Sequence, residues 1–547
     1  MSPPIRILER LPLSDTKRRL SMWFKAAVVL GVSLTTWAAA SEQPPRYAGG
    51  YFPYPFITSV EVKEGRVTVN WDGFGGPFRL QMSSDAGLTN WQSVGSVTTA
   101  RSKTVPVSAT NAIFRVQAPP PGFAGVKICA SCHLPTYREW SGTPHSGAFQ
   151  KLRGYGAETE SSCLPCHSVG YGVSTGYTNI SRTPHLTGVQ CENCHGPAQL
   201  HSVYFDDPQA RARVRVSAEL CGGCHNDFHY PTFDEWKGSG HGTITTRVAQ
   251  DILKSGKDAM TTCGPCHSGA ARLALLNGRP LPDSETAARE SVTCAVCHDP
   301  HKETRPGAQL RNPLVSTEFF SYNMTRSFSS QYKSSVGICV QCHNARGAVW
   351  QDTETAPHPS DQHNILMGNI GLLNGPPEQA EHHRIPQQCV KCHTHVYPSE
   401  DPDESEIGTV DHTFEPWPAN CAPCHSEESA TALISVTQAD LKQRIDLVKE
   451  RLDSWALTKA PAALREKYGR LAWEYHQPGP LSNPDNNPAR LGPTTAEQSD
   501  VPDAIKQARF NLYLVVQDGS LGVHNGKFTR QLLQVAEDKL NSEFAKP

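Results

Sequence analysis

The eighteen cysteines of this 547-residue chain form nine pairs of identical spacing. Two residues separate the cysteines of each pair, and a histidine follows the second cysteine. The pairs are Cys129 and Cys132, Cys163 and Cys166, Cys191 and Cys194, Cys221 and Cys224, Cys263 and Cys266, Cys294 and Cys297, Cys339 and Cys342, Cys389 and Cys392, and Cys421 and Cys424. The histidines are His133, His167, His195, His225, His267, His298, His343, His393 and His425. In this pattern both thiols become thioethers and the histidine binds iron, so the sequence predicts nine covalently attached c-type haems.

Zinc binding and disulfide bonding are the alternatives for closely spaced cysteines. Zinc sites also use two cysteines separated by two residues, but they do not require a histidine after every second cysteine. A disulfide framework does not require all its cysteines to share one spacing. The nine repeats use every cysteine of the chain, which favours haem attachment.

A second iron ligand must come from elsewhere in the chain. Histidine is abundant, because fourteen of the twenty-three histidines lie outside the motifs. Methionine would raise the reduction potential, but only Met82, Met260, Met324 and Met367 follow the first forty residues. We therefore expect two histidines on most irons, with low reduction potentials.

The elements that position these ligands are predicted to be short. The nine motifs span residues 129–425, or 33 residues for each haem. At that density the macrocycles fill most of the interior, so we expect a nonahaem cytochrome domain over 125–430 in which short α-helices and loops surround stacked haems. The predicted fold class is a multihaem cytochrome c fold with an N-terminal all-β sandwich and a C-terminal helical hairpin or bundle.

The first forty residues have the pattern of an export signal. Residues 17–25 are basic, and residues 26–40 form an apolar run that ends in small residues. Residues 1–40 are therefore predicted to be a signal peptide cleaved after Ala40. The alternative is that this segment is retained as a membrane anchor. Export agrees with haem attachment outside the cytoplasm, so we expect a periplasmic or extracellular protein. Residues 41–55 are rich in proline, glycine and aromatic residues and are predicted to be a linker.

Removing the signal peptide changes the net charge. Residues 1–40 carry six basic and two acidic side chains, so the formal charge falls from −2 to −6. Each ferric haem with its propionates makes the protein more acidic. Nucleic acid is therefore not an expected partner, because it is bound through basic surfaces.

Residues 56–118 are predicted to form a small β-sandwich. Alternating apolar and polar residues occur at 57–62, 66–71, 77–82, 91–97 and 112–117, with turn residues between them. Trp71 is expected in the core. The segment is similar to a fibronectin type III module, and it serves as a spacer or a docking module.

The last region, 431–547, is predicted to be helical. A capping sequence at Thr437 precedes Leu441, Ile445, Val448, Leu452 and Trp455, which share one helical face. Further helices are expected at 462–475, 503–518 and 527–542. Gly519 and Gly522 lie in the turn before the last helix and would present His524 at the tip of a helical hairpin.

Several stretches resemble known multihaem c-type cytochromes. Residues 129–149, 188–201, 228–241 and 294–301 resemble the group that includes the tetrahaem partner of hydroxylamine oxidoreductase. Residues 389–395, 411–425 and 508–525 resemble larger octahaem and pentahaem reductases of nitrogen and sulfur compounds. The resemblance covers about 125–545 and implies second iron ligands at His145, His201, His241, His301, His395, His412 and His524. His363 and either His229 or His358 are further candidates, whereas His185, His382 and His383 stay open.

Two functions follow from this pattern. Nine closely packed haems can carry electrons, with redox proteins or a quinol-linked donor as partners. Alternatively, one iron with an open coordination position could reduce or oxidise a small nitrogen or sulfur compound. The lysine that replaces the motif histidine in pentahaem nitrite reductases is absent, and no other catalytic pattern is evident. The sequence favours an electron carrier, and it leaves the oligomeric state open.

Overall fold

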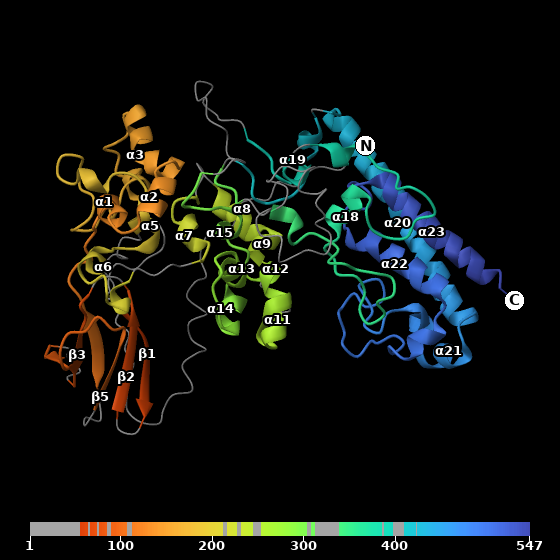
Figure 1. Cartoon of the computed structure of the whole chain (residues 1–547), viewed down its shortest axis with the longest axis horizontal. Helices are drawn as coiled ribbons and strands as arrows, with labels where there is room; N and C mark the ends of the chain where they lie inside the picture. The colour runs from red at the N-terminus through yellow and green to blue at the C-terminus, as the bar shows by residue number, and fades with distance from the viewer. Residues whose placement is uncertain are drawn as a thin grey trace, which may run out of the picture.

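A computed structural model shows an elongated protein whose regions follow one another along the long axis (Figure 1). The β-strands and the first short helices lie at one end, further short helices lie in the middle, and long helices form the other end. The structure describes residues 55–63, 66–73, 76–84, 89–106, 112–211, 216–226, 231–243, 253–303, 308–311, 338–385, 388–397, 410–422 and 424–546. The predicted signal peptide and nearly all of the predicted linker lie outside these residues.

Two small antiparallel sheets form the N-terminal region. One has the order β1 (Phe56–Lys63), β2 (Arg66–Asp72) and β5 (Ser102–Pro106), and the other has the order β4 (Gln92–Ser93), β3 (Arg79–Ser83) and β6 (Ile113–Gln117). Alternate residues of β2 are buried, including Trp71, which is 2% exposed and packs edge-on against Phe78. Strand β5 was missed because Val105 is its one buried apolar residue, so it lacks an apolar repeat.

Short helices carry most of the cysteine motifs, and α3, which lies between the first and second motifs, is the longest described α-helix of this region with 11 residues. Their bounds are α1 (Val126–Ala130), α2 (Leu134–Trp140), α3 (Pro144–Gly154), α4 (Leu164–His167), α5 (Cys191–His195), α6 (Gln199–Val203), α7 (Glu219–Gly222), α8 (Thr232–Gly238), α9 (Gly240–Thr243), α11 (Lys257–Thr262), α12 (Gly264–His267), α13 (Gly269–Leu276), α14 (Ser284–Arg289), α15 (Cys294–Cys297), α18 (Gln362–Met367) and α19 (Gln388–His393). The 3-10 helices are η1 (Pro184–Leu186), η2 (Pro208–Ala210), η4 (Glu381–Arg384) and η5 (Pro418–Cys421). Glycine is the C-cap residue of α5, α7 and α18, and proline lies in the first turn of α2, α3, α4 and α12.

The C-terminal region consists of longer helices. They are α20 (Glu427–Thr458), α21 (Ala462–Tyr468), η6 (Gly469–Trp473), η7 (Glu497–Asp500), α22 (Asp503–Gln517) and α23 (Gly526–Phe544). Helices α20, α22 and α23 lie side by side (Figure 1) and bury one apolar cluster between them. Leu441, Val448 and Leu452 of α20 are fully buried in this cluster.

Two predicted helix boundaries in this region are wrong. Helix α20 begins at Glu427 instead of Thr437, and the side chain of Ser426 accepts a hydrogen bond from the Ser429 N–H as its N-cap. The first turns were missed because most of their side chains are exposed, so they lack an apolar face. The helix expected over 462–475 ends at Tyr468, because Gly469 adopts a positive φ of 54° and a 3-10 turn follows.

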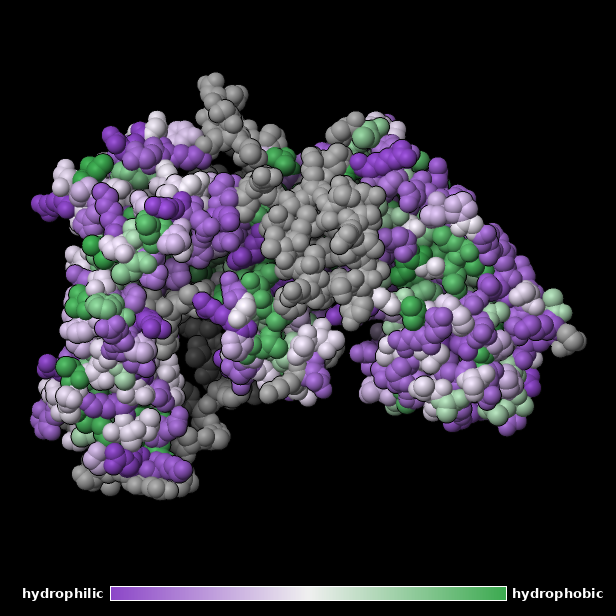
Figure 2. Space-filling view, in the orientation of Figure 1, coloured by the Kyte–Doolittle hydropathy of each residue, from purple (hydrophilic) through white to green (hydrophobic). Residues whose placement is uncertain are grey.

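Within the described residues, no helix is both long enough and apolar enough to cross a membrane. On the face drawn in Figure 2, hydrophobic residues form small areas within a largely hydrophilic surface.

Candidate haem-binding sites

The structure brings histidine rings together in pairs, with one ring of each pair from a cysteine motif. We number the motifs 1 to 9 in chain order, from Cys129–His133 to Cys421–His425. Seven motif histidines face a histidine from elsewhere in the chain, at ring-centroid separations of 5.9–6.4 Å. The pairs are His133 with His201, His225 with His145, His195 with His301, His343 with His241, His267 with His358, His298 with His412, and His393 with His524.

These separations fit an iron atom held between the two rings. A bond between a metal and an imidazole nitrogen is about 2 Å long, and two such bonds plus the inner half of each ring span about 6 Å. Direct stacking of the rings would bring the centroids closer than this. A hydrogen bond between two ring nitrogens is shorter than two metal–nitrogen bonds in series, so it would also give a smaller centroid separation. The side chains present therefore fit a haem iron with two axial histidines.

The electrostatic surroundings keep many of these rings neutral. Burial lowers the pKa of His195, His225, His241 and His358 to about 4. Only the neutral imidazole has a free lone pair for a metal. At pH 7 these side chains are therefore ready to coordinate iron without first losing a proton.

Backbone carbonyl groups orient several motif histidines through Nδ1. The Nδ1 atom of His167 lies 2.8 Å from the carbonyl oxygen of Ala148, and those of His298 and His393 lie 2.8 Å from the carbonyl oxygens of Ala308 and Phe414. With Nδ1 donating to a carbonyl oxygen, Nε2 is left as the metal-binding atom. At these motifs the two cysteines and the hydrogen-bonded ring would hold a haem.

The histidines that face motif histidines come from distant parts of the chain. His145 lies on α3, His201 on α6 and His241 on α9. His412 lies before motif 9, and His524 lies between α22 and α23, 131 residues after His393. Each pair therefore crosslinks two segments when both rings bind one iron.

The motifs also contact one another through their thiols. The thiols of five motif pairs lie next to each other: Cys129 and Cys191, Cys166 and Cys224, Cys221 and Cys294, Cys266 and Cys342, and Cys339 and Cys389. Thiols of further motifs interact electrostatically, including Cys194 with Cys221, Cys297 with Cys342, and Cys392 with Cys421. These contacts place the motifs in the order 1, 3, 4, 6, 7, 8, 9, with motif 2 beside motif 4 and motif 5 beside motif 7.

The exposure of the cysteine side chains agrees with this order of the motifs. All eighteen cysteines are among the described residues and none forms a disulfide, and only Cys132 of motif 1 and Cys424 of motif 9 are exposed. These are the two ends of the order that the thiol contacts define. No group of three or more histidine, cysteine or acidic side chains forms a metal site within the described part of the chain, in contrast to what tetrahedral zinc requires.

The seven pairs account for seven of the ten predicted second ligands, and His229, His363 and His395 are the other three. His229 lies outside the described residues. The ring of His395 stacks on Trp417 at 5.9 Å, and its Nδ1 atom lies 2.7 Å from Asn420 Oδ1. His363 is buried, and its backbone N–H donates to the carbonyl oxygen of His343. Among the described residues, no histidine ring faces His167 of motif 2 or His425 of motif 9 at the separation of the seven pairs.

One side chain that the sequence did not single out joins motifs 1 and 3. Glu192 lies between the two cysteines of motif 3 and is 3% exposed. Its carboxylate accepts hydrogen bonds from the N–H groups of Ala124, Gly125 and Ala198 at 2.7–2.9 Å. Burial raises the pKa of Glu192, and these bonds oppose the rise. The residues between the cysteines vary freely among the motifs, so the sequence offers no indication of this role.

The motifs, the ring pairs and the comparisons with known proteins define this chain as a multihaem c-type cytochrome. A protein-family model described as "Cytochrome c554 and c-prime" matches residues 128–196 and 338–426, which include motifs 1, 2, 3, 7, 8 and 9.

Among curated proteins, the chain is similar to "Multiheme cytochrome MtrA" of Shewanella baltica (strain OS185), with 27% identity over 293 residues that cover 45% of this chain and 80% of that protein. It is also similar to "Cytochrome c-554" of Nitrosomonas europaea, with 35% identity over 92 residues that cover 14% of this chain and 39% of that protein. Among solved structures, "Outer Cell Wall Cytochrome OcwA" shares the fold with a TM-score of 0.50 and 20% identity, covering 76% of this chain and 99% of that one.

Proposed function

We propose that this protein is an exported nonahaem cytochrome that carries electrons between two partners at opposite ends of its motif order. When bound, each haem supplies one iron that cycles between the ferric and ferrous states. The observation that carries the proposal is the single order of thiol contacts from motif 1 to motif 9, whose end motifs hold the exposed cysteines. The protein's part is to space, insulate and tune these centres.

The seven ring pairs support two axial histidines on most irons. We propose His145, His201, His241, His301, His358, His412 and His524 as the second ligands of motifs 4, 1, 7, 3, 5, 6 and 8, respectively. Imidazole on both faces gives a six-coordinate iron with a low reduction potential and leaves no position for a substrate. This ligation suits outer-sphere electron transfer.

The remaining regions are proposed to support this role from outside the haem stack. Residues 56–118 form a fibronectin-III-like spacer or docking module. The helices after residue 430 hold His524 against motif 8. The "Outer Cell Wall" in the description of a structural neighbour agrees with a signal peptide at 1–40 and a position outside the cytoplasm, where redox proteins or a quinol-linked donor can reach the end motifs.

A second function rests on motifs 2 and 9. Among the described residues, neither His167 nor His425 has a facing histidine ring, and His425 is exposed. An iron with a free coordination position there could act on a small nitrogen or sulfur compound. This alternative predicts a high-spin ferric haem and substrate turnover.

Mass spectrometry and electron paramagnetic resonance of the purified protein test these proposals. The intact mass should include nine haems, and a fully matured protein with eight or fewer contradicts the attachment prediction. For a pure carrier, the oxidised spectrum should contain low-spin signals alone, and all nine haems should be reduced by a flavin donor and reoxidised by an external acceptor. A high-spin signal that changes when nitrite, hydroxylamine or sulfite is added, with steady consumption of that compound, would favour the enzyme.

A further inference from the structure

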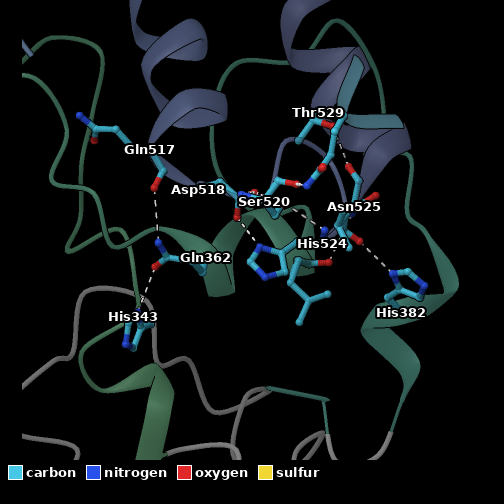
Figure 3. Close-up of polar contacts among 12 residues, drawn as sticks. His343, Gln362, His382, Gln517, Asp518, Ser520, His524, Asn525 and Thr529 are labelled. Atoms are coloured by element: carbon cyan, nitrogen blue, oxygen red, sulfur yellow. Dashed lines mark hydrogen bonds and ion pairs between the residues drawn. The ribbon is translucent and has the colours of Figure 1, made fainter. Parts of the chain in front are cut away.

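The C-terminal end of α22 contacts the ligands of two successive motifs (Figure 3). The backbone carbonyl of Gln517 accepts a hydrogen bond from Gln362 Nε2 at 3.4 Å, and Gln362 Oε1 lies 3.2 Å from His343 Nδ1. The next residue, Asp518, places Oδ1 2.6 Å from His524 Nδ1. Adjacent residues of one helix end therefore reach the motif histidine of motif 7 and the facing histidine of motif 8.

Asp518 is placed to accept hydrogen bonds. Its side chain is fully buried. Besides the His524 ring, its Oδ2 atom accepts hydrogen bonds from the backbone N–H of Ser520, at 3.3 Å, and from the Ser520 hydroxyl group. Three donors converge on this carboxyl group, and an acceptor-only role is that of a carboxylate. Ser520 also bonds to the backbone of His524, because its hydroxyl oxygen accepts a hydrogen bond from the His524 N–H at 3.2 Å.

The Nδ1 atom of His524 lies closer to a carboxyl oxygen than that of His301 does, and several other paired rings bond to neutral groups. The Nδ1 atoms of His298, His393 and His412 bond to backbone carbonyl oxygens, that of His343 bonds to an amide oxygen, and that of His358 bonds to a hydroxyl group. Asp299 lies beside His301, but its oxygen is 3.5 Å from the ring nitrogen. A short bond to a carboxylate makes an imidazole a stronger electron donor than a bond to a neutral acceptor does.

We propose that Asp518 is a positioning residue that aims His524 at the iron of motif 8 and strengthens it as a ligand, so that this haem has a lower reduction potential than its neighbour at motif 7. A more basic ligand stabilises ferric iron, whereas the neutral Gln362 leaves the haem of motif 7 higher in potential. Electron transfer from motif 8 to motif 7 is then downhill. This inference rests on the proposed function, because it assumes that electrons pass along the motif order.

The test compares isosteric variants of the full-length holoprotein. Asp518→Asn keeps an acceptor oxygen near His524 but removes the charge, so one low-spin haem should keep its spin state while its reduction equilibrium moves by about tenfold toward the ferrous form. Asp518→Ala removes the acceptor as well, so the same haem should become partly high-spin. Gln362→Glu places a carboxylate beside His343 and should move the haem of motif 7 in the opposite direction.

Spectroelectrochemical titration and electron paramagnetic resonance provide the measurements, and Asp453→Asn is the control. Asp453 is a half-buried carboxylate of α20 that bonds to Trp473 Nε1 at 2.9 Å and Lys449 Nζ at 2.8 Å within the same helical region, away from the histidine pairs. The Asp453→Asn variant should reproduce any loss of helix stability without changing a haem reduction potential.

These measurements distinguish failure of the positioning role of Asp518 from failure of the ligand assignment and from failure of the carrier function. If His524→Ala produces a high-spin haem but Asp518→Asn leaves every potential and spectrum unchanged, the positioning role is overturned and the ligand assignment survives. If both variants leave the spectra unchanged, the ligand assignment is overturned together with the positioning role. Substrate turnover by the unaltered protein would contradict the carrier function, and neither variant is needed to detect it.

Discussion

The segment that carries the nine motifs and the helical region after it contain different kinds of interior. In the described part of residues 125–426, α-helices have at most 11 residues, and the buried apolar side chains form small separate clusters such as that around Phe149 and Leu164. From residue 427 onward, α20 alone has 32 residues, and one large apolar cluster joins α20, α22 and α23. We therefore expect the first region to depend on its haems for a core, whereas the second supplies its own core from side chains.

The largest expected effect is that of withholding haem. When the full chain is produced without haem attachment, residues 125–426 should stay unfolded and be degraded, because paired histidines and thiols cannot replace the buried macrocycles. The helices after residue 427 should stay folded and survive as a protease-resistant fragment, which mass spectrometry can identify. Equal protection of both regions would contradict the comparison.

Core truncation in the helical region should have the next largest effect. Leu452 is fully buried, so Leu452→Ala should lower the free energy of unfolding of this region by about 3 kcal/mol. The haem spectra should not change. Leu447→Ala is the matched control, because Leu447 lies on the same helix and is 49% exposed, so this change should have little effect. Denaturation followed by circular dichroism at helical wavelengths provides the measurement.

A buried carboxyl group gives the helical region its own dependence on pH. Burial raises the pKa of Glu474 from 4.5 to about 7, although its oxygens accept hydrogen bonds from the Tyr513 hydroxyl and the Tyr475 N–H. The folded state therefore binds the proton more tightly than the unfolded state does. The associated stability is fully present below pH 4.5 and is lost as the pH rises through about 7, by roughly 3 kcal/mol at most.

Glu474→Gln keeps the shape of this side chain and should remove that dependence. Thermal unfolding of the helices between pH 5 and pH 8 measures the difference between the two proteins. Identical pH profiles would show that Glu474 does not titrate in this range.

The smallest expected effect is confined to a single haem. His145→Ala should convert the haem of motif 4 from low-spin to high-spin, because His145 is the ring that faces His225. Attachment should persist, since it requires only the cysteines and the motif histidine. His185→Ala is the control, because His185 is exposed and belongs to none of the seven pairs. Electron paramagnetic resonance that detects no high-spin signal in the His145 variant would overturn this ligand assignment.

Some helices and strands could be predicted from the sequence and others could not, for physical reasons. The helix around Leu441 and Val448 was predictable because its apolar residues recur with the helical period, but its true start at Glu427 was not, because the first turns have no buried face. Strand β2 alternates clearly, whereas β5 is paired with it but has no alternation of its own. Periodicity therefore identifies the elements that bury a face against the core, and misses those that only complete a sheet or extend a helix.

The candidate site divides in the same way. Spacing along the chain revealed the motif residues, because attachment chemistry requires neighbouring thiols and an adjacent imidazole. The resemblance to known cytochromes singled out most of the facing histidines, including His524. Neither could show that Asp518 bonds to His524, that Glu192 joins motifs 1 and 3, or that His358 faces His267.

The sequence by itself determined the number and chemistry of the attachment motifs, since these depend on residues no more than four positions apart. The order of the motifs in space, from motif 1 through 3, 4, 6, 7 and 8 to motif 9, was decided only by the tertiary structure. So was the pairing of each histidine with a motif. Both depend on contacts between segments as much as 131 residues apart, as between His393 and His524, and the chain reaches those contacts through the packing of many short elements with no periodicity that could specify a partner.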